Sequence, residues 1–219
     1  MGKSLAKQIA SLSPEKQREW MDSLTEEQVL ELARLPWWFI GRPEQLLPEG
    51  DWRIWLIQTG RGWGKTRTAA ENLVKLVLES PTAPDGAPTE WAVFADTFSD
   101  CRKVCVEGPS GILGVLRGRG MSEGVDFVYN RSIWQIVFTT GQVIHLVAAD
   151  TPDAGRGLNL SGLWADELAM WRYSYQTWNE GISWALRIGK KPRAIVTTTP
   201  KRVQLISKWN RDTSGRVHI

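Results

Sequence analysis

Residues 54 to 66 read Ile-Trp-Leu-Ile-Gln-Thr-Gly-Arg-Gly-Trp-Gly-Lys-Thr, an apolar run followed by a glycine-rich turn that ends in Gly64-Lys65-Thr66. Helix-forming residues continue from Thr68 to Leu78, so the local order is strand, turn and helix. Such a turn directs backbone N–H groups and a helix N-terminus toward one point, where a polyphosphate can bind. In that arrangement Lys65 reaches the β- and γ-phosphates, and the Thr66 hydroxyl ligates Mg²⁺.

The turn departs from the usual phosphate-loop pattern at one position. That pattern has a glycine where this chain has Thr59, and Gly60 and Gly62 supply the backbone freedom instead. A glycine-rich turn that merely ends a strand is the alternative, but the flanking strand and helix favour a phosphate loop. We therefore expect the nucleotide to be bound by Thr59, Gly60, Arg61, Gly62, Trp63, Gly64, Lys65, Thr66 and Arg67.

A second motif places two acids after a short apolar run. Leu163-Trp164-Ala165 reads as a buried strand, and Asp166 and Glu167 follow it. Asp166 would hold Mg²⁺, and Glu167 would orient and deprotonate the attacking water, which indicates hydrolysis rather than transfer to a second substrate. An acidic pair that caps the next helix is the alternative. The phosphate loop upstream favours the catalytic interpretation.

A third motif is a strand that ends in hydroxyl side chains. Ile195-Val196 is followed by Thr197, Thr198, Thr199 and Pro200. Hydroxyls at a strand end could sense whether a γ-phosphate is present. Threonine is also an ordinary strand residue, so this motif gains its meaning from its position after the Asp-Glu strand.

The composition limits the class of protein. A chain of 219 residues can bury one substantial core. We find neither an apolar run of transmembrane length nor the apolar core of a secretory signal after Met1-Gly2-Lys3. Cys101 and Cys105 are too few to complete a zinc site, and we expect reduced thiols.

The basic residues are unevenly distributed, although the net charge is only +3. Nine basic residues stand against the single acid Asp212 between residues 187 and 216: Arg187, Lys190, Lys191, Arg193, Lys201, Arg202, Lys208, Arg211 and Arg216. Such a segment is typical of contact with a nucleic-acid backbone without base readout, and a solvated basic face is an equal alternative.

The order of elements predicts an α/β sandwich with a largely parallel sheet and a site at the carboxyl ends of its strands. Two short helices are expected before Pro36, one starting at Ser13-Pro14 and one at the capping box Thr25-x-x-Gln28. An irregular linker over residues 37–48 would lie over the adenine, where Gln45 could contact the base. We then expect strands at 54–58, 91–95, 133–138, 143–148 and 194–198, helices at 65–79, near 99–106 and from the Asp-Glu strand to about 188, and a flexible glycine-rich region at 108–124.

Taken together, these motifs resemble the ATPase domain of the large terminase subunit of tailed bacteriophages, the motor that drives DNA into a preformed capsid. The resemblance rests on Trp52 to Arg67, on Gly155-Arg156-Gly157 through Asp166-Glu167, and on Thr197 to Pro200, and it covers about residues 36 to 205. It implies a P-loop NTPase of the ASCE type, a three-layer sandwich with a central, mostly parallel sheet.

The resemblance also implies residue roles. Lys65 and Thr66 would bind ATP and Mg²⁺, with Asp166 as the Walker B aspartate and Glu167 as the catalytic glutamate. Thr197, Thr198 and Thr199 would couple hydrolysis to DNA movement, and Arg61 resembles the family's loop arginine. Arg156 resembles an arginine that some terminases insert into the neighbouring subunit's site, and a solvated loop arginine is the alternative.

The family further implies translocation of double-stranded viral DNA into a procapsid in the host cytoplasm. The implied partners are other large-subunit copies in a ring, the portal protein and the small terminase subunit, without a membrane. We expect a helical appendage and linker at 1–48, an ATPase core at 49–205 and the start of a lid at 206–219, with no nuclease domain and no DNA cutting. The alternatives are a helicase-like DNA translocase and a nucleotide-binding assembly module with negligible turnover.

Overall fold

A single eight-stranded sheet organises the computed structural model, which describes residues 8–9, 11–28, 36–189 and 191–219. The strand order is β3-β4-β5-β2-β6-β7-β1-β8. All pairings from β5 to β8 are parallel, whereas β3, β4 and β5 form antiparallel pairs. The strands are β1 (Ile54–Gln58), β2 (Glu90–Ala95), β3 (Phe127–Asn130), β4 (Gln135–Phe138), β5 (Val143–Ala148), β6 (Gly162–Ala165), β7 (Arg193–Thr198) and β8 (Val217–His218).

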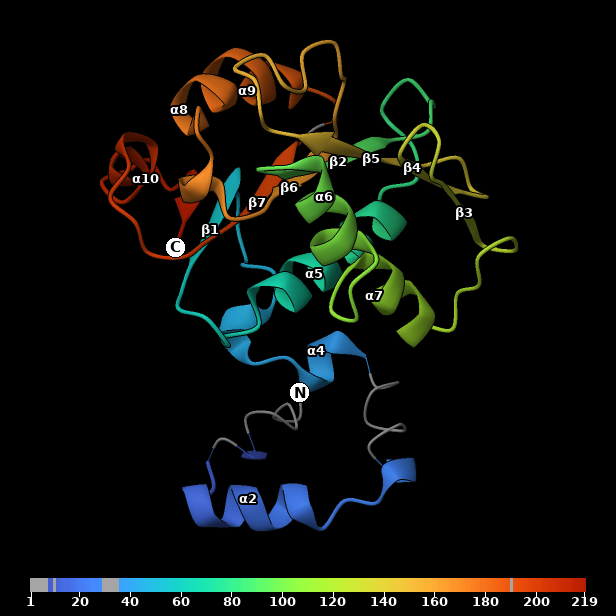
Figure 1. Ribbon diagram of the computed structural model, residues 1–219, viewed down its shortest axis with the longest axis vertical. Coiled ribbons are helices and arrows are strands. Elements are labelled where there is room, and N and C mark those ends of the chain that lie inside the picture. The colour runs from blue at the N-terminus through green and yellow to red at the C-terminus, as the bar shows by residue number, and fades with distance from the viewer. Residues whose placement is uncertain (1–7, 10, 29–35, 190) are drawn as a thin grey trace.

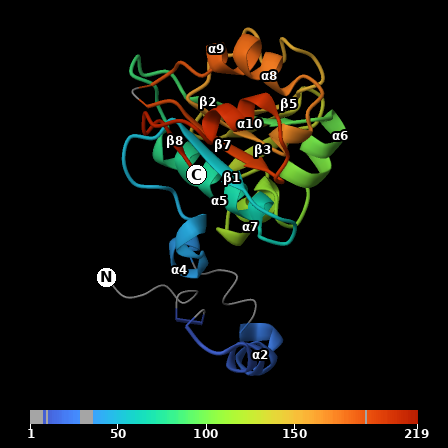
Figure 2. The ribbon, with the colours of Figure 1, turned by 90° about the vertical axis from the view of Figure 1, so that its left-hand side faces the viewer.

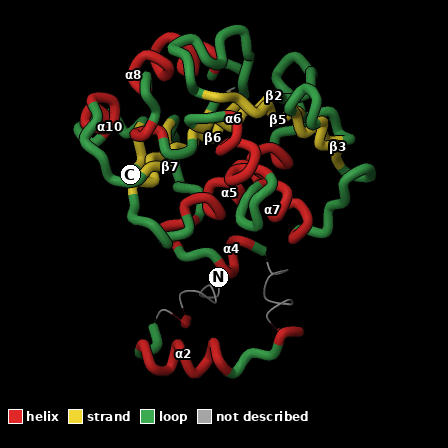
Figure 3. The backbone as a smooth tube through the Cα atoms, in the orientation of Figure 1, coloured by secondary structure: helices red, strands yellow, loops and turns green. Residues whose placement is uncertain are grey.

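Helices cover both faces of this sheet, which confirms the predicted three-layer α/β sandwich (Figures 1 and 3). One face carries α5 (Lys65–Glu79), α6 (Phe98–Asp100), a π-helical turn (Cys101–Val106) and α7 (Ile112–Gly118). The other carries 3-10 turn η3 (Leu168–Met170), α8 (Ser174–Gln176), a π-helical turn (Thr177–Ile182), α9 (Ser183–Ala185) and α10 (Gln204–Trp209).

The strands serve two cores because successive side chains point to opposite faces. In β1, Trp55 and Ile57 pack toward α5, whereas Leu56 packs toward α10. Trp164 in β6 belongs to the first core, and its neighbour Leu163 belongs to the second. Burial on both faces explains why the central strands are continuous apolar runs rather than alternating ones.

The segment predicted as flexible, residues 108–124, is mostly ordered structure instead. It contains α7, and β3 follows it at the edge of the sheet. Gly111 lies so close to the preceding turn that a Cβ there would come within 2.7 Å of the Cys105 carbonyl oxygen. Gly114 would likewise meet the Pro109 carbonyl oxygen at 2.3 Å. These glycines permit close packing, so the expectation of flexibility was wrong.

The long helix expected up to about residue 188 is replaced by the short turns from η3 to α9, which end at Ala185. Gly181 lies within this run, where a Cβ would stand 2.2 Å from the Ala154 carbonyl oxygen. Gly181 makes this close contact with the 151–158 loop from within the π-helical turn Thr177–Ile182. Such turns are common near functional sites.

The sheet also extends past residue 205, the end predicted for the core. Leu205, Ile206 and Trp209 of α10 are buried in the second core, and β8 pairs with β1. Residues 204–218 therefore contribute to the same layered structure.

The N-terminal segment begins as the sequence predicts. The Ser13 hydroxyl caps α2 (Pro14–Asp22) by accepting a hydrogen bond from the Lys16 N–H at 3.4 Å. Thr25 and Gln28 exchange the two bonds of a capping box, at 2.9 and 3.2 Å. The apolar residues expected to follow, Val29 to Leu32, lie outside the described residues. Helix α2 has no buried residue and stands apart from the sheet in both views (Figures 1 and 2).

The predicted linker 37–48 forms two short turns, α4 (Trp37–Ile40) and the 3-10 turn η1 (Pro43–Gln45). It is fixed to α5 because the Asn72 amide donates to the Gln45 carbonyl at 2.8 Å. Within the described ranges, no helix combines the length and the apolar character that crossing a bilayer requires.

Candidate active site

The glycine-rich turn connects β1 to α5, as predicted. Gly62 and Gly64 have positive φ angles of 79° and 94°, which side chains other than glycine rarely adopt. Gly64 is also the N-cap of α5, and a Cβ there would stand 3.0 Å from the Gln45 amide nitrogen. The turn thus combines a left-handed backbone with close contact to the linker, and it presents the start of a 15-residue helix.

Lys65, the first residue of that helix, is 8% exposed and points back across the turn. Its ammonium donates to the Thr59 and Gly60 carbonyls at 3.1 and 3.3 Å and to the Thr199 hydroxyl at 3.4 Å. It also forms an ion pair with Glu167 Oε1 at 3.3 Å. Lys65, in the first motif of the sequence, therefore contacts both the second and the third motif.

Glu167 follows β6 in an unusual backbone conformation. Its φ and ψ angles are 47° and 41°, a left-handed region that is uncommon for residues other than glycine. The carboxylate is held by Thr199, whose N–H donates to Oε2 at 2.8 Å and whose hydroxyl lies 3.1 Å from Oε1. This strained backbone turns the carboxylate toward Lys65 and Thr199.

Asp166 directly follows β6 and lies deeper than Glu167, with 8% exposure. Its Oδ1 accepts a hydrogen bond from the Thr197 hydroxyl at 2.8 Å, and that hydroxyl accepts one from the Trp164 indole at 2.9 Å. Burial raises the pKa of the Asp166 carboxyl to about 6, opposed by the Thr197 hydrogen bond and reinforced by the Glu167 charge. The two adjacent acids therefore occupy different environments.

The three threonines at the end of β7 have separate contacts. Thr197 is hydrogen-bonded to Asp166, and Thr199 is hydrogen-bonded to Glu167 and Lys65. Thr198 accepts a bond from the Ala169 N–H at 3.2 Å, and its carbonyl accepts one from the Thr59 N–H at 3.2 Å. The carboxyl ends of β1, β6 and β7 are thus joined by hydrogen bonds, as their neighbouring places in the sheet allow.

A cleft of about 520 Å³ opens over the turn from Gly60 to Arg67 and is bounded by Glu167. Its far wall was not predicted: Lys103, Val104, Gly108, Pro109 and Ser110 form it, at the junction of the π-helical turn and α7. The glycines of this segment were the only sequence signal for this wall, and they indicated a flexible segment rather than a packed one.

The other residues predicted to bind nucleotide differ in burial and in their distance from the cleft. Gln45 is 6% exposed, and its amide donates to the Trp63 carbonyl at 3.2 Å, so it is bound to the turn. Arg42 reaches the same carbonyl at 2.7 Å and stacks on the Trp63 ring. Arg61 is exposed at the mouth of the cleft.

Arg67 lines the cleft but is bound elsewhere. Its guanidinium donates to Glu71 Oε1 at 2.9 and 2.6 Å. Arg119 from the end of α7 contacts the other oxygen of Glu71 at 2.9 Å. Glu71 is buried, and a buried carboxylate requires such partners. The structure therefore gives Arg67 an ion-pair role between α5 and α7.

Arg156 is not brought to this cleft. It is exposed on the loop before β6 and lines a separate cavity of about 260 Å³ with Glu180, Trp184 and Arg187. In the described part of the chain, no three His, Cys, Asp or Glu side chains gather as a ready-made metal site.

Comparisons with known proteins agree with this arrangement. The model of a family described as the N-terminal part of the terminase large subunit, T4-like-virus type, matches residues 56–216. None of the curated proteins matches the chain.

Among solved structures, the chain is similar to the ATPase domain of the large terminase of Thermus phage P74-26, with 18% identity and a TM-score of 0.60 over 84% of this chain and 73% of that one. It is also similar to the large terminase of bacteriophage HK97, with 12% identity and a TM-score of 0.54 over 76% of this chain and 34% of that one. The large terminase of another thermophilic bacteriophage is 15% identical to this chain, with a TM-score of 0.55. The similarity covers 86% of this chain and 44% of that one. That terminase has also been solved with ADP and with ATP-γ-S. At these identities the likeness shows the fold alone.

Proposed function

Because the chain belongs to the family of phage terminase large subunits and matches its N-terminal ATPase domain, we propose that it hydrolyses ATP to move double-stranded viral DNA into a procapsid. The observation that carries this proposal is the convergence of Lys65, Glu167 and Thr199 at the carboxyl ends of β1, β6 and β7. A phosphate-binding cation and a carboxylate that can act as base are two of the groups that enzymes use for phosphoryl transfer to water, and here the Thr199 hydroxyl contacts both.

Binding of ATP would rearrange the Lys65–Glu167 ion pair. The phosphates would lie over the N–H groups from Gly60 to Thr66, at the start of α5, where the helix dipole favours anions. Lys65 would move its ammonium from Glu167 to the β- and γ-phosphates. The freed Glu167 carboxylate would then accept a proton from the attacking water, in a position fixed by the Thr199 N–H.

The oxygen donors at the site fit Mg²⁺. Thr66 offers a hydroxyl and Asp166 a carboxylate, and Mg²⁺ commonly takes one or two protein oxygens with phosphates and waters. When bound, the ion would neutralise phosphate charge. Above a pH of about 6 the Asp166 carboxyl is ionised and able to ligate it.

We further propose that Thr197, Thr198 and Thr199 couple hydrolysis to DNA movement. They contact Asp166, the 3-10 turn at Ala169 and Glu167, and the chain runs directly from them toward α10. A change in the contacts of Glu167 would therefore pass to the segment that begins at Lys201.

The proposed partners are DNA, other copies of the large subunit in a ring, the portal protein and the small terminase subunit, in the host cytoplasm. Lys201 and Arg202, just before α10, and Lys208, within it, are exposed, which supports contact with DNA phosphates. Exposure of Arg156 supports its proposed action across a subunit interface rather than in its own cleft.

The test is ATP hydrolysis by Glu167→Gln, which retains the size of the side chain but removes the base. We expect hydrolysis to fall by roughly two to four orders of magnitude while ATP still binds. Glu79→Gln, at the exposed end of α5, is the matched control and should be unaffected. Normal turnover by Glu167→Gln would show that another residue is the base, and no turnover by the wild-type chain with DNA and procapsids would favour an assembly module.

A further inference from the structure

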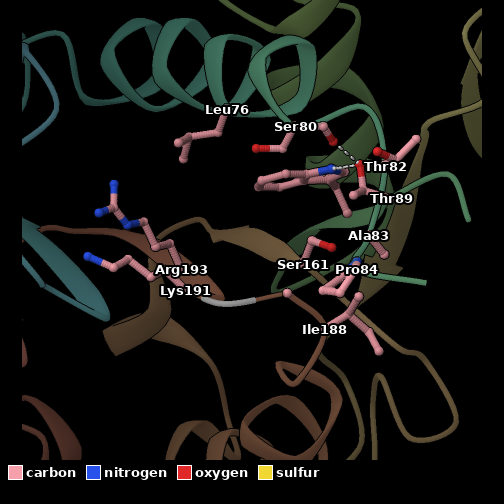
Figure 4. A pocket seen from close by; sticks show the side chains of 12 residues that line it. Leu76, Ser80, Thr82, Ala83, Pro84, Thr89, Ser161, Ile188, Lys191 and Arg193 are labelled. Atoms are coloured by element: carbon pink, nitrogen blue, oxygen red, sulfur yellow. Dashed lines mark hydrogen bonds between the residues drawn. The ribbon is translucent and has the colours of Figure 1, made fainter. Parts of the chain in front are cut away.

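Another cavity, of about 500 Å³, is drawn in Figure 4. It lies at the ends of the strands opposite to the candidate active site. Trp91, Ser161 and Arg193, which line it, stand at the starts of β2, β6 and β7. The 80–89 loop, Ile188 and Gly189 close its other sides. Its volume is in the range of small-molecule sites.

Two buried polar groups at this cavity lack hydrogen-bond partners among the described residues. Ser161 is 8% exposed, and its hydroxyl has no partner. The Nε of Arg193 is likewise buried and unpaired. By contrast, the neighbouring Thr89 hydroxyl donates to the Ser80 carbonyl at 2.6 Å and accepts from the Trp91 indole at 2.8 Å (Figure 4). An unpaired buried donor destabilises the folded state, so a ligand acceptor that reaches these groups would gain affinity.

The charge at the cavity is of one sign. Lys191 and Arg193 lie together on one side of it, and its lining includes no acid (Figure 4). Lys191 pairs with Asp51 at 3.1 Å, but both side chains are more than half exposed, so this ion pair is weak. Arg193 stacks on Trp52 and donates to the Gly50 carbonyl, which holds its guanidinium in place. The cavity therefore favours an anion.

The rest of the lining is apolar. Leu76, Ala83, Pro84, Trp91 and Ile188 supply surface for a flat hydrophobic body, and the Trp91 indole is anchored by Thr89. We propose that this cavity binds a small aromatic carboxylate, with the ring system against Trp91 and the carboxylate toward Ser161, Lys191 and Arg193. The site does not depend on the proposed ATPase activity.

Calorimetry with 2-naphthoate tests the proposal, and 2-naphthamide serves as the uncharged analogue of the same shape. The wild-type chain should bind the carboxylate at least about tenfold more tightly than the amide, which is 1.4 kcal/mol. Saturating Mg²⁺ and the β,γ-imido analogue of ATP should not displace it. Equal affinity for the two compounds, or displacement by the nucleotide, would overturn the proposal.

Two variants locate the site. Ala83→Phe fills the cavity, and Lys191→Glu reverses an exposed charge without changing the core. Each should weaken naphthoate binding by about tenfold or more, whereas Lys75→Glu, on the exposed side of α5, should not. Thermal unfolding checks that Ala83→Phe is folded, and Lys191→Glu carries the test if it is not. Unchanged affinity in Lys191→Glu would refute the assignment.

Discussion

Replacement of Asp166 by asparagine should make the protein more stable at neutral pH, although it removes a proposed Mg²⁺ ligand. The Asp166 carboxyl is 8% exposed, and burial raises its pKa from 3.8 to about 6. The folded protein therefore binds a proton at Asp166 more tightly than the unfolded chain does. Ionisation of this group then opposes folding.

The sign and size of the effect follow from this pKa. Well below a pH of about 4 both states are protonated, and the penalty is absent. It grows as the pH rises to about 6 and stays constant above that, where a shift of about two pKa units corresponds to about 3 kcal/mol. Asparagine keeps an oxygen for the Thr197 hydroxyl but carries no charge. Its NH₂ group must also be buried, so we expect a gain of about 1–3 kcal/mol in the free energy of unfolding at pH 7.5.

Urea unfolding without nucleotide or metal, followed by tryptophan fluorescence from pH 4 to pH 8, measures this gain. The stability of Asp166→Asn relative to wild type should increase as the pH rises from 4 and become constant above a pH of about 6. Asp150→Asn, at an exposed position after β5, should show no such trend. A variant that is less stable than wild type at pH 7.5, or a difference independent of pH, would refute the reasoning.

Three further predictions concern the proposed activity. Lys65→Ala should abolish tight Mg-ATP binding in calorimetry while Lys75→Ala does not, and equal affinity in both would remove the phosphate-loop assignment. Thr199→Val should lower kcat by about tenfold or more with little change in ATP affinity, because Glu167 loses the hydroxyl contact but keeps the backbone one; an unchanged kcat would show that this hydroxyl is dispensable. Arg156→Ala and Glu167→Gln subunits, each inactive alone, should regain activity when mixed if Arg156 acts in trans, whereas turnover that survives Arg156→Ala would exclude that role.

The sequence predicted β1 and α5 to the residue because each signal there is local. The apolar run, the positive-φ glycines and the helix-forming stretch up to Glu79 depend little on the rest of the fold. The Asp-Glu and threonine motifs could be placed on strands for the same reason. Their place at one edge of the sheet followed from the rule that parallel strands end at the same edge, whereas their individual hydrogen bonds were not predicted.

The far wall of the cleft could not be predicted because it depends on tertiary packing. Gly108 and Gly111 read as flexible in the sequence, yet each lies within about 3 Å of a carbonyl oxygen of the preceding turn when a Cβ is added. A single sequence does not distinguish a glycine that is required for close packing from one that is required for mobility. Only the fold shows that Lys103 and Ser110 face the phosphate loop.

The contacts of Lys65 in this structure are one reason why we expect an isolated subunit to hydrolyse ATP slowly. Lys65 is 9% exposed at its side chain and is occupied by Glu167, which is itself held by Thr199. A polyphosphate can displace this single carboxylate because it carries more charge and also accepts bonds from the turn. On this proposal Glu167 would be released when nucleotide binds, so the base would become available together with its substrate. The remaining requirement is a cation for the γ-phosphate, and our proposal gives that task to Arg156 of a neighbouring copy because Arg156 lies exposed outside this cleft.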